Sequence, residues 1–127
     1  MSRIVVDASA VLALLNAEPG ATVVEARLAG ALISAVNLAE VHAKLADYGM
    51  ADAEIRSAVD ALALETIAFD VAMAHRAGQL RPATRALGLS LGDRACLALA
   101  QVANLPVLTA DRAWAALDIG VRIETIR

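Results

Sequence analysis

The 127-residue sequence has few of the residues that stabilise small domains by special means. It contains a single cysteine, Cys96, so an intramolecular disulfide cannot form, and this fits a reducing compartment such as the cytoplasm. Only three residues are aromatic, whereas 31 are alanine and 18 are leucine. A chain of this length buries roughly two thirds of its unfolded surface. We therefore expect one domain, residues 1–127, with a helix-rich core of small side chains.

Long apolar runs are also missing. No run approaches the roughly 18 residues that a transmembrane helix needs. Near the N terminus, Asp7 interrupts an apolar stretch before it reaches the length of a signal peptide. We therefore expect a cytoplasmic protein that does not enter the membrane, in which the apolar fraction of 59% forms a core or a partner surface.

An excess of basic residues is missing as well. The chain has 14 acidic and 11 basic side chains and a net charge of −3, which by itself argues against a nucleic-acid ligand. The charge is uneven, however. Residues 1–70 contain ten acidic and four basic side chains, whereas residues 71–112 contain five arginines against Asp93 and Asp111. The second segment is the better candidate for a surface that contacts phosphate.

Short β-branched segments alternate with helical segments along the chain. We expect strands at residues 3–6, 31–34, 64–67, 106–109 and 121–126. We expect helices at 8–15, 23–28, 35–48, 52–62, 70–87 and 93–103, and a helical turn at 112–117. Pro82 should end or kink the fifth helix near Arg81. This alternation predicts an α/β/α sandwich around a mainly parallel sheet, in which ligands bind beyond the carboxyl ends of the strands.

Four carboxylates share an apolar sequence context although they belong to four different elements. They are Asp7, Glu40, Asp93 and Asp111. Burying several unpaired carboxylates together is untenable without cations, so either each pairs with an arginine or they share a metal ion. With one cysteine and two separate histidines, His42 and His75, the chain lacks the ligand set that zinc prefers. A shared site would therefore suit Mg²⁺ or Mn²⁺.

Each of the four carboxylates also has a structural explanation. Asp7 and Asp111 could cap the helical segments that follow them, and Asp93 could be an acid of the first turn that the helix dipole favours. Glu40 could pair with Lys44 four residues later, an interaction that contributes only about 0.3–0.5 kcal/mol. The residue pattern alone leaves the metal site and these structural roles about equally open.

Other reactive side chains lack the partners that catalysis would need. His42 and His75 are isolated, which is more typical of surface or core positions than of metal ligands. Cys96 lies in an apolar helix, which favours packing over nucleophilic chemistry. Ser9 is not part of a nucleophile elbow, and the chain has no glycine-rich phosphate loop.

The segments that contain the four carboxylates resemble those of the PIN-domain ribonucleases, and within that family those of the VapC toxins of bacterial toxin–antitoxin systems. The similar segments are VVDASA at 5–10, SAVNLAEV at 34–41, GLSLGDRA at 88–95 and PVLTADRAW at 106–114. They follow the order and approximate spacing of the family and span essentially the whole chain. The resemblance implies the three-layer α/β/α sandwich of a PIN domain.

The resemblance also implies an activity and the residues that perform it. The four carboxylates would bind Mg²⁺ or Mn²⁺, and Ser9 and Thr109 would support the site through hydrogen bonds. The reaction would be endonucleolytic cleavage of RNA by metal-activated water, leaving a 3′-hydroxyl and a 5′-phosphate. Arg94 and Arg112 adjoin the acids and are our first candidates for contacts with RNA. The target, whether transfer, ribosomal or messenger RNA, is not specified by any readout motif.

A partner protein is implied too. Toxins of this family are typically homodimers that a VapB-type antitoxin inhibits by covering the active site, and the amphipathic residues 9–28 and 36–62 offer faces for such a helix. The main alternative is a PIN-like module that binds partners without catalysis. A receiver domain is disfavoured, because it needs paired acids after the first strand and a lysine after the last, whereas this chain has Asp7 alone and its only lysine is Lys44.

Overall fold

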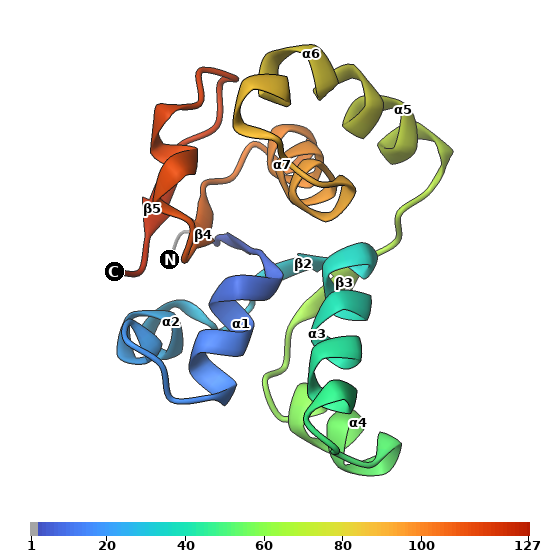
Figure 1. The fold of residues 1–127 in the computed structure, drawn as a ribbon, viewed down its shortest axis with the longest axis vertical. Helices are drawn as coiled ribbons and strands as arrows, with labels where there is room; N and C mark the ends of the chain where they lie inside the picture. The colour runs from blue at the N-terminus through green and yellow to red at the C-terminus, as the bar shows by residue number, and fades with distance from the viewer. Residues whose placement is uncertain (1–2) are drawn as a thin grey trace.

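A central parallel sheet organises the computed structural model, which describes residues 3–127 (Figure 1). Its strands are β1 (Val5–Val6), β2 (Leu32–Ser34), β3 (Glu65–Ile67), β4 (Val107–Thr109) and β5 (Ile123–Thr125). Their order across the sheet is β3-β2-β1-β4-β5, and every neighbouring pair is parallel. Because strands that follow one another in a parallel sheet need a crossover, helical segments connect them.

Helices cover both faces of this sheet (Figure 1). One group consists of α1 (Ala8–Leu15), α2 (Ala21–Arg27), α3 (Ala35–Asp47) and α4 (Asp52–Asp60). The other consists of α5 (Val71–Gln79), α6 (Arg81–Thr84), the 3₁₀ turn η1 (Arg85–Leu87) and α7 (Leu91–Ala103), and a second 3₁₀ turn, η2 (Arg112–Ala116), follows β4. No helix in residues 3–127 is long and apolar enough to cross a membrane.

Alternating side chains of the strands divide the interior into two cores. Val6 and Leu108 pack with the α1–α4 group, whereas Val5 and Val107 pack with α7 and Trp114. All five of these side chains are at most 1% exposed. Because successive side chains of a strand point to opposite faces of the sheet, each face has its own core and its own layer of helices. The predicted α/β/α sandwich with a parallel sheet is confirmed.

Most predicted helices differ from the structure by one or two residues at an end, and two of the differences have a clear local cause. The helix expected at 70–87 is divided into α5, α6 and η1, and Pro82 lies in the first turn of α6, where its missing N–H costs nothing. The helix expected from residue 93 begins at Leu91, because Ser90 and Asp93 form a reciprocal capping box. The Asp93 amide donates to Ser90 Oγ at 3.1 Å and the Ser90 amide donates to Asp93 Oδ2 at 2.9 Å. Gly92, expected in a loop, is therefore helical.

Candidate active site

Several of the acidic residues follow strands that end at one edge of the sheet. Asp7 directly follows β1, and Asp111 comes two residues after β4. Glu40 lies in the second turn of α3, which begins immediately after β2. Because β2, β1 and β4 are parallel neighbours, their carboxyl ends share this edge, where α/β proteins bind ligands. Helix α7 packs against α3 and brings Asp93 toward the same place.

The carboxylate of Asp7 is buried and accepts three hydrogen bonds. Oδ1 accepts from the Ser9 hydroxyl at 2.7 Å and from the Ala10 amide at 2.9 Å, and Oδ2 accepts from the Thr109 hydroxyl at 2.6 Å. Burial raises the pKa of Asp7 above its ordinary value; the hydrogen bonds oppose this rise, and the negative charge of Asp93 adds to it. The site thus contains a carboxylate whose ionised form lacks a compensating positive charge.

Two hydroxyl groups connect Asp7 to the end of β4. Ser9 Oγ accepts a hydrogen bond from the Ala110 amide at 2.9 Å, and Thr109 Oγ1 accepts one from the Asp111 amide at 3.1 Å. The two hydroxyl oxygens are 3.3 Å apart. Because each hydroxyl also donates to Asp7, the start of α1, the end of β4 and the Asp7 carboxylate form one hydrogen-bonded unit.

Glu40 reaches the beginning of α7. Its Oε1 accepts a hydrogen bond from Asn37 Nδ2 at 2.8 Å. Its carboxylate also lies so close to Gly92 that a Cβ added there would come within 2.4–2.6 Å of both oxygens and Cδ. The ion pair considered as an alternative role for Glu40 is not formed with Lys44; Lys44 Nζ instead lies 5.9 Å from the centre of the Tyr48 ring, which suits a cation–π contact.

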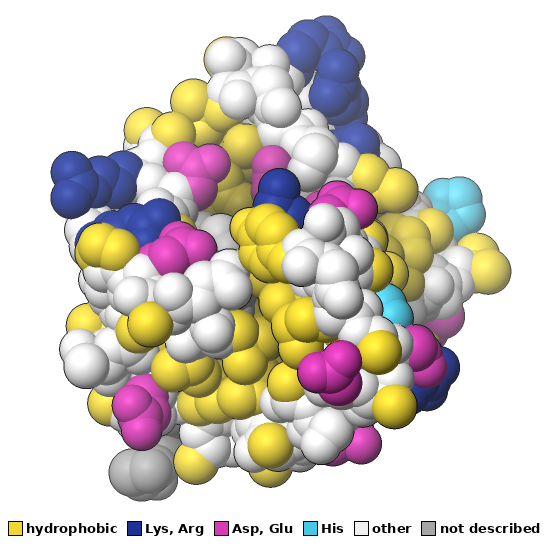
Figure 2. All heavy atoms as spheres, turned by 60° about the horizontal axis from the view of Figure 1, so that its bottom comes forward, with side chains coloured by type: hydrophobic (Ala, Val, Ile, Leu, Met, Phe, Trp, Pro, Cys, Tyr) yellow, Lys and Arg dark blue, Asp and Glu magenta, His cyan; other side chains and the backbone are white. Residues whose placement is uncertain are grey.

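One cavity of about 270 Å³ joins these groups. Three carboxylates line it, those of Asp7, Glu40 and Asp93. The other lining residues are Ala8, Ser9, Leu12, Asn37 and Lys44. In the view of Figure 2, acidic side chains border a hollow in the surface, and hydrophobic side chains cover much of the face below it.

The buried thiol of Cys96 is affected by the same three negative charges. Cys96 is fully buried, and burial raises the pKa of its thiol well above the ordinary value. The negative charges of Asp7, Asp93 and Glu40 raise it further. The thiol therefore stays protonated, which disfavours nucleophilic chemistry at this residue.

Asp111 is not among the residues that line the cavity, although its backbone amide donates to the Thr109 hydroxyl that holds Asp7. It is exposed and accepts a hydrogen bond from the Ala113 amide at 3.0 Å as the cap of η2. Asp7 likewise caps α1, and Asp93 takes part in the cap of α7. The capping roles considered from the sequence are thus present, and for Asp7 and Asp93 they coexist with a place in the cavity.

The family of the chain follows from a comparison with known proteins. The family model of the PIN domain matches residues 4–120. The chain belongs to the PIN domain family. No curated protein sequence matches it significantly. The expected resemblance to PIN domains is therefore confirmed over nearly the whole chain.

Solved structures share this fold. A toxin–antitoxin complex from Klebsiella pneumoniae is 23% identical over 98% of each chain, with a TM-score of 0.78. DNA-bound VapBC from Salmonella typhimurium is 21% identical over 100% of each chain, with a TM-score of 0.74. VapBC-5 from Mycobacterium tuberculosis is 25% identical over 100% of this chain and 99% of its own, with a TM-score of 0.58. At these identities the likeness extends to the arrangement of strands and helices.

The cavity of this PIN domain has the donor chemistry of a hard divalent cation. Its oxygen donors are three carboxylates and the hydroxyl of Ser9, and thiolate or imidazole ligands are absent from its lining. The raised pKa of Asp7 shows that the site would gain from a positive charge. Within residues 3–127, no three His, Cys, Asp or Glu side chains come close enough together to hold a metal ion between them. The donor set fits Mg²⁺ or Mn²⁺ in chemical type, and water would have to supply part of the coordination.

The arginines expected to contact RNA lie outside the cavity lining. Arg94 is half-buried between α7 and α5, where its Nη1 donates to the Ala77 carbonyl at 3.1 Å. Arg112 is exposed, and its Nε donates to the Arg127 carbonyl at 2.8 Å. The basic side chain that does line the cavity is Lys44, which the sequence suggested only as a partner of Glu40 and not as part of the site. Its position one helical turn after Glu40 was the available signal.

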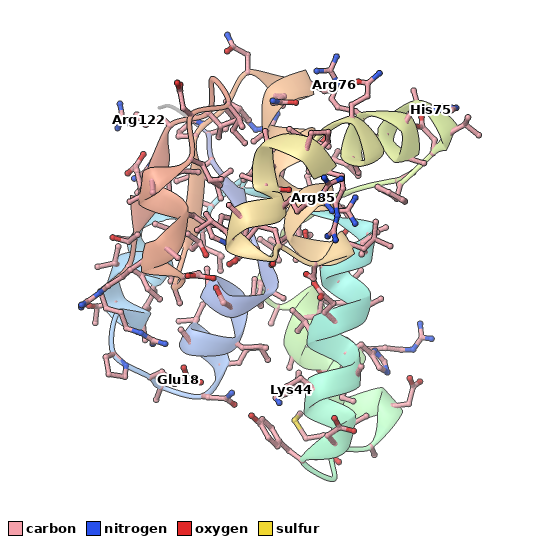
Figure 3. All side chains as sticks on the ribbon, turned by 45° about the horizontal axis from the view of Figure 1, so that its top comes forward. Glu18, Lys44, His75, Arg76, Arg85 and Arg122 are labelled. Carbon is pink, nitrogen blue, oxygen red and sulfur yellow. The ribbon has the colours of Figure 1, made fainter. Side chains whose placement is uncertain are left out.

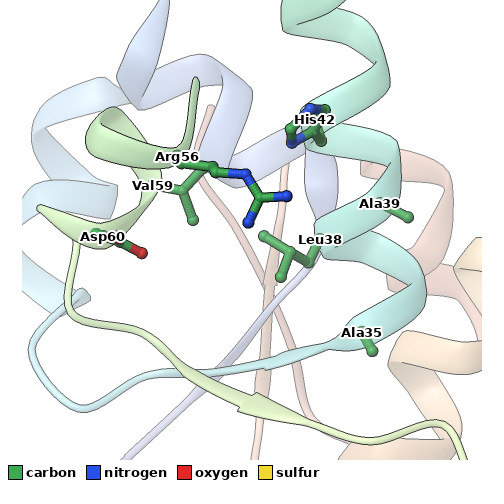
Figure 4. A pocket seen from close by; sticks show the side chains of 7 residues that line it. All are labelled: Ala35, Leu38, Ala39, His42, Arg56, Val59 and Asp60. Carbon is green, nitrogen blue, oxygen red and sulfur yellow. The ribbon is translucent and has the colours of Figure 1, made fainter. Parts of the chain in front are cut away.

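A second and larger cavity of this PIN domain, about 340 Å³, lies between α3 and α4 (Figure 4). Four of its lining residues are apolar, among them Leu38 and Val59, and the other three are His42, Arg56 and Asp60. The Arg56 side chain extends into the space between the two helices (Figure 4). His42 Nε2 is 3.1 Å from Asp52 Oδ1, so this histidine has a side-chain partner. The other histidine, on α5, is exposed (Figure 3). This cavity has the single carboxylate of Asp60 in place of the carboxylate cluster, and its lining combines apolar with charged side chains.

Proposed function

We propose that this PIN domain is an endoribonuclease that uses Mg²⁺ or Mn²⁺ to hydrolyse RNA phosphodiesters. The observation that carries the proposal is the meeting of Asp7, Glu40 and Asp93 at one cavity on the carboxyl edge of a parallel sheet. These three side chains would hold the cation, and Asp111 at the neighbouring strand end completes the acidic set. When bound, the cation would lower the pKa of a water molecule and neutralise charge on the phosphodiester.

The surrounding residues orient these carboxylates. Ser9 and Thr109 hold the two oxygens of Asp7 by short hydrogen bonds, so its carboxylate cannot rotate freely. Lys44 lies at the cavity and can reach a phosphate oxygen by leaving its contact with the Tyr48 ring. The protein would thus contribute oriented carboxylates and the ammonium group of Lys44, and it needs no covalent nucleophile.

The RNA surface that we propose extends from the cavity over the second group of helices. Residues 71–112 contain five arginines, of which Arg76 and Arg85 lie on α5 and η1 (Figure 3). Arg94 and Arg112 flank Asp93 and Asp111 in the sequence and are the first positions to test. Arginine suits this role because its planar donor group matches the geometry of phosphate.

Cleavage of RNA tests the catalytic proposal. The protein, freed of any partner, is incubated with total cellular RNA and Mg²⁺, Mn²⁺ or EDTA, and the product ends are mapped. We expect metal-dependent cleavage with 3′-hydroxyl and 5′-phosphate ends, and a loss of at least about 100-fold in Asp7→Asn with the fold retained. Wild-type protein that stays inactive with every metal while binding a partner would favour the alternative of a silent binding module.

We further propose that the chain is a VapC-type toxin acting in the cytoplasm as a homodimer and inhibited by a VapB-type antitoxin. The similar solved structures described above are toxin–antitoxin complexes, which supports a partner of this kind. The cavity between α3 and α4 and the exposed side chains of Val23 and Tyr48 provide surface for an amphipathic helix. Co-expression with the gene immediately upstream should yield a complex, and recovery of the bare 13 kDa chain would contradict this part of the proposal.

A further inference from the structure

Asn37 connects the two helices that carry Glu40 and Asp93. Its side chain is 1% exposed, on the inner face of α3. Nδ2 donates two hydrogen bonds, one to Glu40 Oε1 at 2.8 Å and one to the Gly92 carbonyl at 3.0 Å. Both partners accept and cannot donate, so the orientation of the Asn37 amide is determined by its neighbours. The amide therefore links the Glu40 carboxylate to the first turn of α7.

Gly92 provides the surface against which this carboxylate lies. A Cβ at residue 92 would approach Glu40 Oε2 to 2.4 Å and Oε1 to 2.5 Å. The backbone of Gly92 is ordinary helix and has no positive φ, so glycine is not required there by conformation. The three atoms nearest to an added Cβ all belong to Glu40, so the close approach of this side chain is a reason for glycine here. Because the clashing atoms are the end of a flexible side chain, alanine at residue 92 would displace the carboxylate and leave the helix in place.

Stability alone does not explain an asparagine at residue 37. Its Oδ1 is buried and has no hydrogen-bond partner among the described residues, which costs free energy in the folded state. Asparagine is also a weak helix former compared with alanine, and residue 37 is in a helix. What asparagine contributes at this position, and alanine could not, is the pair of hydrogen bonds from Nδ2 to Glu40 and to the Gly92 carbonyl.

We propose that Asn37 and Gly92 are positioning residues that hold the Glu40 carboxylate at the Asp93 side of the cavity. The proposal rests on the proposed function, because it concerns the preorganisation of the same cation site. Glu40 is otherwise an exposed side chain with freely rotating bonds, and a cation that binds it must first restrict those rotations. Asn37 and Gly92 impose that restriction in advance, which strengthens cation binding.

Two variants and two matched controls test this role. Asn37→Ala removes the donor, and Gly92→Ala displaces the carboxylate. Gly78→Ala makes the same exchange on helix α5, where an added Cβ has no neighbour within 4 Å. Thr84→Ala removes another fully buried polar side chain that does not line the cavity. Mn²⁺ binding is measured by electron paramagnetic resonance, together with the melting temperature of each metal-free protein.

We expect Asn37→Ala and Gly92→Ala to weaken Mn²⁺ binding about tenfold or more. The melting temperature of each of these two variants should fall by less than that of Thr84→Ala, because both substitutions remove a poor helix former from a helix. Gly78→Ala and Thr84→Ala should bind Mn²⁺ like the wild type. In a Glu40→Ala background, Asn37→Ala should have no further effect on Mn²⁺ binding. Unchanged Mn²⁺ affinity in both test variants, or equal losses in the controls, would overturn the positioning role.

A measurement without metal separates this role from the proposed function. The side-chain amide of Asn37 gives its own ¹H–¹⁵N signals, and these should shift in Glu40→Gln, because the charged acceptor of the Nδ2 hydrogen bond is replaced by a neutral group. Signals that do not move would contradict the positioning role. Wild-type protein that binds no Mn²⁺ would instead contradict the proposed function, whatever the Asn37 signals show.

Discussion

Replacing Thr109 by valine should destabilise the protein in a way that depends on pH. Thr109 is fully buried, and valine keeps its shape while removing the hydroxyl that donates to Asp7 Oδ2 at 2.6 Å. A hydrogen bond to a charged group contributes about 1.5–3 kcal/mol, and one between neutral groups about 0.5–1.5 kcal/mol. We therefore expect a loss of about 2 kcal/mol where Asp7 is ionised and about 1 kcal/mol where it is protonated.

The pKa of Asp7 determines how the stability loss of Thr109→Val changes with pH. Burial raises this pKa, and the Thr109 hydrogen bond holds it down. Valine raises it further, so the variant loses the most stability at pH values above the pKa of Asp7 and less at pH values below it. Urea unfolding at pH 8 and pH 4, followed by the fluorescence of the single tryptophan, Trp114, measures both values.

A neighbouring threonine provides the control for this experiment. Thr125 pairs with Thr109 in the sheet but is exposed, so Thr125→Val removes a hydroxyl from the adjacent strand without touching Asp7. We expect it to change stability by less than about 0.5 kcal/mol at either pH. Equal losses for Thr109→Val at both pH values would refute the view that its hydroxyl stabilises a charged carboxylate.

Three further predictions concern charge at and away from the site. Burial raises the pKa of Asp7 above 3.8, so the contribution of Asp7 to stability should fall as the pH rises from 3.8 through the raised value. The difference in unfolding free energy between the wild type and Asp7→Asn, measured by urea unfolding without metal at several pH values, should show that fall. A Mg²⁺ concentration 100 times the Kd should stabilise the wild type by about 2.7 kcal/mol and leave Asp7→Asn unchanged, as measured by thermal unfolding with and without EDTA. The hydrogen bond from Arg27 lowers the pKa of Glu124, so the 2.7 Å pair stabilises the fold above the ordinary carboxyl pKa and the benefit disappears as the pH falls through the lowered one. Because both side chains are partly exposed, Arg27→Met should lower the free energy of unfolding by about 1 kcal/mol or less at pH 7, as measured by urea unfolding. A larger loss at pH 3 than at pH 7 would contradict a stabilising ion pair between Arg27 and Glu124.

Local signals explain which helices the sequence predicts well. The helix at 8–15 agrees with α1, and the helix at 35–48 differs from α3 by one residue, because Asp7 and Ser34 are strong N-caps directly before them. The sequence predicts the start of α7 two residues late, because a glycine such as Gly92 on its own is typical of a loop. Its helical state depends on the capping box of Ser90 and Asp93, together with the Glu40 carboxylate that lies against it.

The candidate site was predictable where it depends on topology and not where it depends on side-chain packing. Parallel strands place their carboxyl ends at one edge, so the position of Asp7 and the approach of the other acids follow from the order of elements. The Asp111 side chain caps the local turn η2 and does not line the cavity, which the order of elements does not predict. The contact of Asn37 with Gly92 joins residues 55 positions apart, and no periodicity of a single helix indicates it.

The central claim is that the cavity carboxylates support metal-dependent cleavage of RNA. The most direct test is the initial rate of RNA cleavage at saturating Mg²⁺ for the wild type, for Asp93→Asn and for Asp118→Asn, an exchange of an exposed acid that does not line the cavity. We predict that Asp118→Asn cleaves like the wild type and that Asp93→Asn loses at least about 100-fold in rate with its fold intact. Equal rates for Asp93→Asn and the wild type would contradict the claim.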